Sequence, residues 1–205
     1  MQDLITLHDV AKVFKTRSKT FEIIYLLYGT KEVTRQIFSN EEMENVAKFC
    51  RENSLFFETN PKKISFIDSE ESDGYSELGK FVEPDNADYT SANNIIYISK
   101  SKVKIVEACL ADLTNNHRKL GLLLSYPSCC VRAFSENIEK GKIIEYNVHG
   151  FADISKRQQD CSFISHFPCS SNCKASEMLA LVNYKIISLI DKELADEVKI
   201  KLDSN

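Results

Sequence analysis

The sequence predicts an α+β protein that is mostly helical, with a small sheet and a long C-terminal helix. Apolar residues recur at helical spacing in several segments, short β-like runs lie between turn residues, and the last segment has the longest periodic stripe. The chain has 205 residues, 43% hydrophobic and 27% charged. This is the composition of an ordinary globular protein, which excludes disorder, collagen and coiled coil for its bulk. We expect a single domain over residues 1–205.

The first half alternates between helical and β-like patterns. Apolar residues between positions 4 and 14 lie at helical spacing and predict an amphipathic helix. The next apolar stretch, residues 21–38, is broken by Gly29 and fits either a helix or a strand. Ser39 followed by Glu42 is a capping-box signature, which predicts that a helix begins there.

An acidic, turn-rich segment follows two more β-like runs. The runs cover residues 55–58 and 64–67 and predict two short strands, separated by Asn60 and Pro61. Residues 69–86 then predict a solvated loop. The loop suggests a subdivision of the domain into an N-terminal part (1–68), the acidic loop (69–86) and a C-terminal core (87–205).

The second half predicts one strand and three helices. Residues 95–99 have a strand pattern, and residues 102–113 and 115–124 have helical patterns. The last helix is expected to run from Ser171 to about Lys201. Its apolar stripe predicts packing in the core, with binding of a protein partner as the alternative. The stripe consists of Met178, Leu179, Val182, Ile186, Leu189, Ile190 and Leu194.

Composition also bears on location and partners. A net charge of −4 argues against nucleic-acid binding, because phosphate neutralisation needs a basic face. The longest apolar run, residues 23–28, is too short for a membrane span, and no early segment resembles a secretory signal. We therefore expect a cytoplasmic protein. In that reducing compartment seven cysteines predict ligands, reactive thiols or core residues more than disulfides.

Four of the seven cysteines lie at predicted helix starts. Tyr126 and Pro127 should end one helix, with Ser128 as the N-cap of the next, so that Cys129 and Cys130 lie in its first turn. The second group follows another proline. There Ser170 or Ser171 is expected to cap the last helix, with Cys169 just before it and Cys173 in its first turn.

This location favours metal or cluster chemistry. Free N–H groups and the positive end of the helix dipole stabilise a thiolate, the form of cysteine that binds metal. Adjacent side chains diverge, so we expect one of Cys129 and Cys130 to bind together with Cys169 and Cys173. The fourth position is then left for Cys161, His166, solvent or substrate. Such a site suits an iron–sulfur cluster or a zinc ion.

The leading hypothesis is an iron–sulfur protein. As an enzyme, it would carry out sulfur transfer or desulfuration on a small sulfur-containing substrate. His166 and Arg132 are the candidate catalytic residues. Arg132 lies within a turn of the cysteines and can either bind an anionic substrate or pair with a carboxylate. Alternatives are a structural zinc or disulfide-stapled interaction module and a metal-free cysteine redox enzyme.

The remaining cysteines and serines have simpler predictions. Cys50 and Cys109 lie on apolar helix faces and are expected in the core. The hydroxyl of Ser176, like those of Ser170 and Ser171, can donate to cluster sulfurs. The sequence has no glycine-rich phosphate loop, nucleophile elbow or His-Glu-x-x-His motif.

The two cysteine segments resemble an uncharacterised family of mainly archaeal and some bacterial proteins, domain of unknown function number 483. Ser125 departs from the family pattern, which has a glycine before Tyr-Pro. The upstream segments 27–31 and 48–53 also look familial. The resemblance implies no activity, and it supports the cysteines as the site. The matching residues are Leu120, Gly121, Leu123, Leu124, Tyr126, Pro127, Cys129, Cys130, Val131, Phe134, His166, Pro168, Cys169, Ser170, Cys173 and Ser176.

Overall fold

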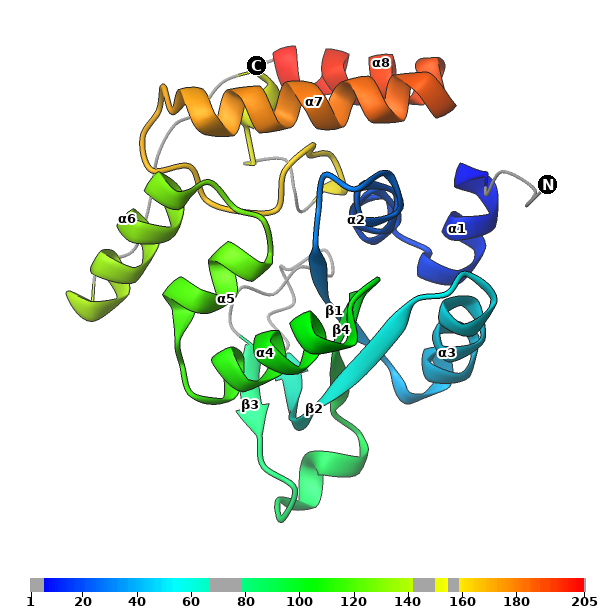
Figure 1. Cartoon of the computed structure of the whole chain (residues 1–205), viewed down its shortest axis with the longest axis vertical. Coiled ribbons are helices and arrows are strands. Elements are labelled where there is room, and N and C mark those ends of the chain that lie inside the picture. Colours follow the sequence, from blue (N-terminus) through cyan, green and yellow to red (C-terminus); the bar gives the residue numbers. More distant parts are fainter. Residues whose placement is uncertain (1–5, 67–78, 142–149, 155–158, 205) are drawn as a thin grey trace. The chain divides into compact units, whose positions relative to one another are not determined.

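The computed structural model describes residues 6–66, 79–141, 150–154 and 159–204 (Figure 1). The chain forms two compact units: unit 1 comprises Met1–Lys31 and Ser125–Asn205, and unit 2 comprises Glu32–Leu124. The described residues contain eight α-helices and one four-stranded sheet, so the predicted α+β class is confirmed. No described helix is both long enough and apolar enough to cross a bilayer.

Unit 2 is built around an antiparallel sheet with the strand order β1-β4-β2-β3. Strand β4 is one of the two inner strands and is buried along almost its whole length, with Tyr97 and three isoleucines fully buried on it. The strands are β1 (Val33–Phe38), β2 (Phe56–Phe66), β3 (Gly79–Val82) and β4 (Asn93–Ser99).

The sheet corrects two predictions. The two short strands expected at 55–58 and 64–67 are one strand, β2, whose pairing with β4 is irregular between Thr59 and Lys63. Asn60 replaces the lost backbone pairing: its side-chain oxygen accepts the N–H of Lys62 at 2.9 Å, and its amide donates to Tyr97. Strand β3 lies inside the segment predicted as an acidic loop, while positions 69–78 of that segment lie outside the described residues.

Three helices complete unit 2. The capping box of Ser39 and Glu42 is confirmed, and it opens a 3-10 turn that leads into α3. Helix α4 packs on the sheet, and its inward face carries Cys109, which is buried as predicted. Cys50 is likewise buried. The helices are α3 (Met43–Glu52), α4 (Lys102–Leu113) and α5 (His117–Leu123), close to their predicted bounds.

A polar network joins α4 to the sheet. Arg35 and Tyr97 are cross-strand neighbours, and both reach the carboxylate of Asp112 on α4. The Arg35 Nε lies 2.8 Å from the Asp112 Oδ2, and the Tyr97 hydroxyl donates to the same oxygen. Asn60 donates to the Tyr97 hydroxyl at 2.9 Å. Because a buried carboxylate needs charged or hydrogen-bonded partners, this network determines how α4 lies on the sheet.

Unit 1 combines the two ends of the chain. The ambiguous stretch 21–38 divides at Gly29: the preceding residues form α2, which ends with Gly29 in the left-handed region at a φ of 82°, and the following residues form β1 of unit 2. The predicted N-terminal helix is confirmed as α1. The helices are α1 (Leu7–Phe14), α2 (Arg17–Tyr28), α6 (Ser128–Glu139), α7 (Lys174–Ile190) and α8 (Lys192–Asp203).

The long C-terminal helix is confirmed in α7, and a separate helix, α8, follows and runs beside it (Figure 1). The break lies at Asp191, whose backbone is extended and whose carboxylate accepts the Leu194 N–H at 2.9 Å. Asp191 ends one helix and caps the next although the apolar pattern continues past it, so the single helix expected to about Lys201 is wrong.

The buried face of α7 also differs from the predicted stripe. Met178, Val182 and Leu189 are exposed, with Leu189 at 80%. The helix instead buries Ser176 and Asn183 together with small and aliphatic residues. Two polar side chains therefore face inward in place of larger apolar ones.

We predict that Asp112→Ala lowers the free energy of unfolding of unit 2 by about 3 kcal/mol, because it leaves Arg35 and Tyr97 without their shared acceptor. Urea unfolding measures the loss. Lys48→Ala, which removes an exposed partner of Glu52 on α3, serves as the control and should change stability by less than about 0.5 kcal/mol. Equal effects of the two variants would contradict this role of Asp112.

Candidate metal centre

The structure brings the four predicted cysteines together. The sulfur atoms of Cys129, Cys130, Cys169 and Cys173 all lie within 4.8 Å of one another, a group suited to holding a metal ion. Cys173 is central: its Sγ lies 3.8 Å from that of Cys129 and 3.5 Å from those of Cys130 and Cys169. Residues from two segments separated by 38 residues in sequence thus share one site.

The first pair lies in the opening turn of α6, as expected. The cap itself differs from the prediction: Pro127 is the N-cap, and Ser128 is the first helical residue. Proline suits the start of a helix because its ring fixes the backbone φ angle and because it has no backbone N–H group that would lack a hydrogen-bond partner there. The sulfurs of Cys129 and Cys130 lie 3.8 Å apart, so both neighbours belong to the group and the expected divergence of adjacent side chains does not separate them.

The second pair lies at the start of α7. Cys173 is the N-cap of this helix, with its backbone N–H bonded to the carbonyl of Ser170 at 3.3 Å. The predicted caps Ser170 and Ser171 are therefore wrong, because the helix begins at Lys174, beyond the position that either of them would cap. A cysteine at the N-cap lies directly before the free N–H groups of the first turn, where a thiolate is favoured.

Ser176 and His166 surround the sulfurs with hydrogen bonds. Ser176 is fully buried, and its Oγ lies 3.2 Å from the Cys130 Sγ and 3.4 Å from the Cys173 Sγ. The His166 Nε2 lies 2.9 Å from the same hydroxyl. The predicted contact between Ser176 and the sulfurs is present, whereas His166 reaches them through Ser176.

Two other candidates lie outside the sulfur group. Cys161 is fully buried and its thiol donates to the carbonyl of Val198 at 3.6 Å, so it is a core thiol in this structure. Arg132 is exposed on α6, and a catalytic role for it stays a prediction. All seven cysteines are free thiols.

The thiols of the group differ in their pKa values. Burial raises the pKa of Cys130 well above its ordinary value. Burial together with the hydrogen bonds that the Cys169 thiol makes with Cys173 and Cys129 raises the pKa of Cys169 to about 11. Burial also acts on Cys173, but hydrogen bonds from the side chain and backbone of Ser176, and from neighbouring thiols, bring its pKa down to about 6. Without a metal, Cys173 is the thiol of lowered pKa, and the Cys169 thiol donates a hydrogen bond to it.

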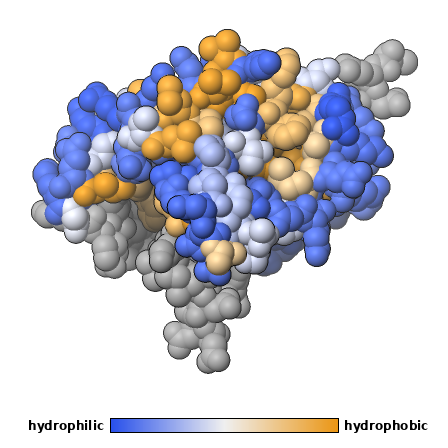
Figure 2. Space-filling model, turned by 90° about the horizontal axis from the view of Figure 1, so that it is seen from below, coloured by the Kyte–Doolittle hydropathy of each residue, from blue (hydrophilic) through white to orange (hydrophobic). Residues whose placement is uncertain are grey.

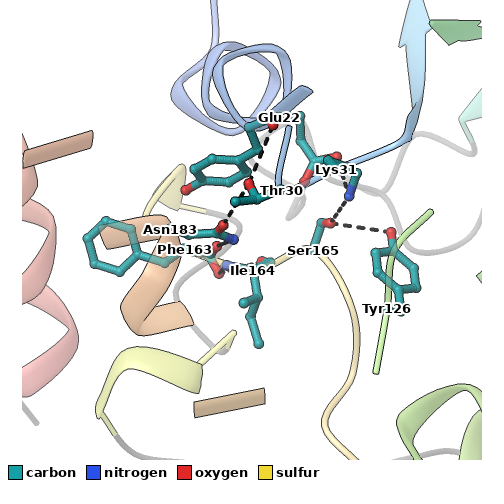
Figure 3. A network of polar contacts seen from close by, with 10 residues as sticks. Glu22, Thr30, Lys31, Tyr126, Phe163, Ile164, Ser165 and Asn183 are labelled. Carbon is teal, nitrogen blue, oxygen red and sulfur yellow. Dashed lines mark hydrogen bonds and ion pairs between the residues drawn. The ribbon is translucent and has the colours of Figure 1, made fainter. Parts of the chain in front are cut away.

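The structure also places near the site residues for which the sequence predicted no role. Lys31 and Glu22 form an ion pair, and Lys31 contacts Ser165 and Tyr126, next to both cysteine segments (Figure 3). A lysine after an apolar helix looks like an ordinary surface residue. Only its membership of the familial segment 27–31 set it apart in the sequence.

We predict that Ser125→Gly stabilises the protein by about 1 kcal/mol. Ser125 has a φ of 62°, in the left-handed region, where a side chain is strained and the family pattern has glycine. Thermal unfolding measures the gain. Ser128→Gly, made in the first turn of α6, should give no such gain, and a loss of stability with Ser125→Gly would contradict the strain.

The lowered pKa of Cys173 predicts a thiolate that forms near pH 6 in metal-free protein. The ultraviolet absorbance of thiolates should rise as the pH is raised through about 6, well below the ordinary cysteine value of about 8.5. Cys173→Ser should remove this transition, while Cys161→Ser should keep it. A first transition near pH 8.5 in the unmodified protein would contradict the geometry of the group.

Comparison with known proteins identifies the family. No curated protein and no solved structure matches the chain. One family profile does, over residues 94–202, which is more than half of the chain and includes all four clustered cysteines. The resemblance carried by the cysteine segments is thereby confirmed: the chain belongs to the family described as protein of unknown function, DUF483.

Proposed function

We propose that the four clustered cysteines hold a single zinc ion that joins the N-termini of α6 and α7, and that the protein is a structural zinc module. The observation behind the proposal is the spacing of the sulfurs. The four pairs with a direct contact lie 3.5–3.8 Å apart, and no pair exceeds 4.8 Å.

This spacing matches one tetrahedral ion. Zinc binds thiolates at about 2.3 Å, and a tetrahedron of that radius has edges of about 3.8 Å. In a four-iron cluster each cysteine binds a different iron, so the four sulfurs stand farther apart than around one ion. The soft thiolate set also disfavours magnesium and calcium. Zinc therefore fits the group better than the iron–sulfur cluster expected from the sequence.

The number of ligands supports a structural role. Four protein thiolates fill the coordination sphere of zinc, and closed sites of this kind stabilise folds, whereas catalytic zinc keeps a position open. The ion would close a chain segment of 38 residues between Cys130 and Cys169. The unfolded chain does not hold four thiolates in this arrangement, so the ion binds the folded state and its binding free energy contributes directly to folding.

We predict that protein purified without added metal contains one zinc per chain, and that a chelator unfolds unit 1. Cys173→Ser should weaken zinc binding by more than the 10–100-fold typical of losing an outer partner, because Cys173 contacts all three other sulfurs. Competition with a chromophoric chelator measures the affinity. Cys161→Ser is the matched control, a buried thiol of the same unit outside the group, and should leave the affinity unchanged.

Elemental analysis after anaerobic purification decides between metals. Iron and sulfide in place of zinc, with visible absorbance, would contradict the zinc proposal. Fewer than seven free thiols in metal-free, denatured protein would support a disulfide-stapled module instead.

The second candidate function is an iron–sulfur enzyme of sulfur transfer or desulfuration. It is favoured by the exposure of the site: Cys129 and Cys169 are only partly buried, so a small sulfur-containing substrate can reach them. In this case His166 and Arg132 remain the candidate catalytic residues. Anaerobic reconstitution with iron and sulfide tests it, since a colourless, iron-free product would exclude a cluster.

Two further proposals concern the location of the protein in the cell and its binding of a protein partner. A cytoplasmic location suits four free thiols, because an oxidising compartment favours disulfides. A protein partner on the C-terminal helix stays a prediction, and the exposed Met178, Val182 and Leu189 of α7 are the surface that would carry it. Figure 2 shows one face of the molecule, on which hydrophobic residues gather among hydrophilic ones.

A further inference from the structure

Lys31 is a buried cation beside the candidate metal centre. Only 7% of the residue is exposed, and its Nζ lies 2.7 Å from the Glu22 Oε2 on α2. Glu22 is itself largely buried, with 13% of its side chain exposed. Burying both charges costs desolvation free energy, and a pair of apolar residues often stabilises a fold equally well. The buried pair of Lys31 and Glu22 therefore suggests a role in holding neighbouring residues in position.

The Lys31 ammonium also contacts Ser165 and the ring of Tyr126, and Figure 3 shows the hydrogen bonds that link Lys31 to Ser165 and Ser165 to Tyr126. The ammonium donates to the Ser165 Oγ at 3.2 Å and lies 4.8 Å from the centre of the Tyr126 ring. Since Lys31 donates to Ser165, the Ser165 hydroxyl points its own proton to the Tyr126 hydroxyl, 3.3 Å away. One cation thus holds a serine and a tyrosine in fixed relative positions.

These two residues belong to the two segments that carry the cysteines. Tyr126 precedes Cys129 by three positions, and Ser165 precedes Cys169 by four. The Tyr126 ring also packs on the ring of His166, with 5.1 Å between centres. His166 in turn contacts Ser176, whose hydroxyl reaches two of the sulfurs. A continuous chain of contacts therefore leads from the ion pair to the sulfurs.

The neighbouring Thr30 ties the same loop to α7. Its Oγ1 lies 3.5 Å from the Asn183 Oδ1, and the Asn183 amide donates to the Phe163 carbonyl at 2.8 Å (Figure 3). The loop after α2 thus contacts Tyr126, Ser165 and Asn183. Tyr126 and Ser165 lie shortly before the two pairs of cysteines in the sequence, and Asn183 lies on α7, the helix that Cys173 caps.

We propose that Lys31 and Glu22 are positioning residues of the metal centre, which set the relative placement of the Cys129–Cys130 and Cys169–Cys173 segments. The proposal rests on the proposed function, since it concerns the affinity of the same site for zinc. Both residues lie outside the family match over residues 94–202. The N-terminal part of the chain accordingly completes a site whose ligands all come from the matched part.

The test uses the full-length double variant Lys31→Met with Glu22→Gln, which removes both charges and leaves neither one unpaired. We expect its zinc affinity, measured by chelator competition, to fall about tenfold, the scale of losing an outer partner of a metal site. With Co²⁺ in place of zinc, the visible spectrum should shift because the sulfur geometry changes. The matched control, Arg35→Met with Asp112→Asn, removes the comparable ion pair of unit 2 and should change neither affinity nor spectrum.

The outcomes separate the two proposals. An unmodified protein that binds no zinc refutes the proposed function itself. If the unmodified protein binds zinc and the double variant has the same affinity and Co²⁺ spectrum with only a lower melting temperature, the ion pair is merely structural and the positioning role is overturned. Should the double variant fail to fold, Tyr126→Phe keeps the ring and the ion pair but removes the acceptor of Ser165. We expect it to weaken zinc binding several-fold, and an unchanged affinity would overturn the proposal.

Discussion

Repulsion between neighbouring thiolates governs the candidate metal centre. Two unit charges about 4 Å apart repel by about 1 kcal/mol in water and by about 4 kcal/mol at an effective dielectric constant of about 20. Four sulfurs within 4.8 Å of one another therefore cannot all ionise unless a cation joins them. The pKa values of the thiols agree with this repulsion. The pKa of Cys173 is lowered, whereas burial and contacts with the neighbouring thiols raise the pKa values of Cys130 and Cys169.

The same site explains the orientation of α7. Hydropathy alone favours burying Met178, Val182 and Leu189, yet these side chains face outward. Each residue turns the helix by about 100°, so a residue two positions before an exposed one lies about 200° away, on the opposite face of the helix. Ser176 must face inward to reach the sulfurs, and Asn183 to reach the Phe163 carbonyl. Hydrogen bonds at the site thus outweigh apolar burial on this helix, and the exposed apolar residues are the consequence.

Local signals in the sequence predicted local features well. The Ser39 capping box, the bounds of α4 and the four cysteines at helix starts all depend on residues a few positions apart, where backbone chemistry is decisive. Features that depend on distant contacts were missed. The bulge that makes β2 one strand needs Tyr97 as a partner for Asn60, and the break at Asp191 competes with a pattern that continues past it. Lys31 belongs to this second class, since only the fold brings it to Tyr126 and Ser165.

The order of the segments along the chain has a consequence for folding. Unit 2 is continuous in sequence, whereas unit 1 needs its first 31 residues and its last segment together. Bringing the two segments of unit 1 together closes a long loop, which costs conformational entropy before the contacts between the segments form. Unit 2 is one continuous segment, so it has the simpler route to its fold. The four cysteines all belong to the second segment of unit 1, so a metal ion bound to them would fix only the stretch between Cys129 and Cys173. The contacts of Lys31 with Ser165 and Tyr126 join the first segment to that stretch, and they are the contacts that bear the entropic cost of bringing the two segments together.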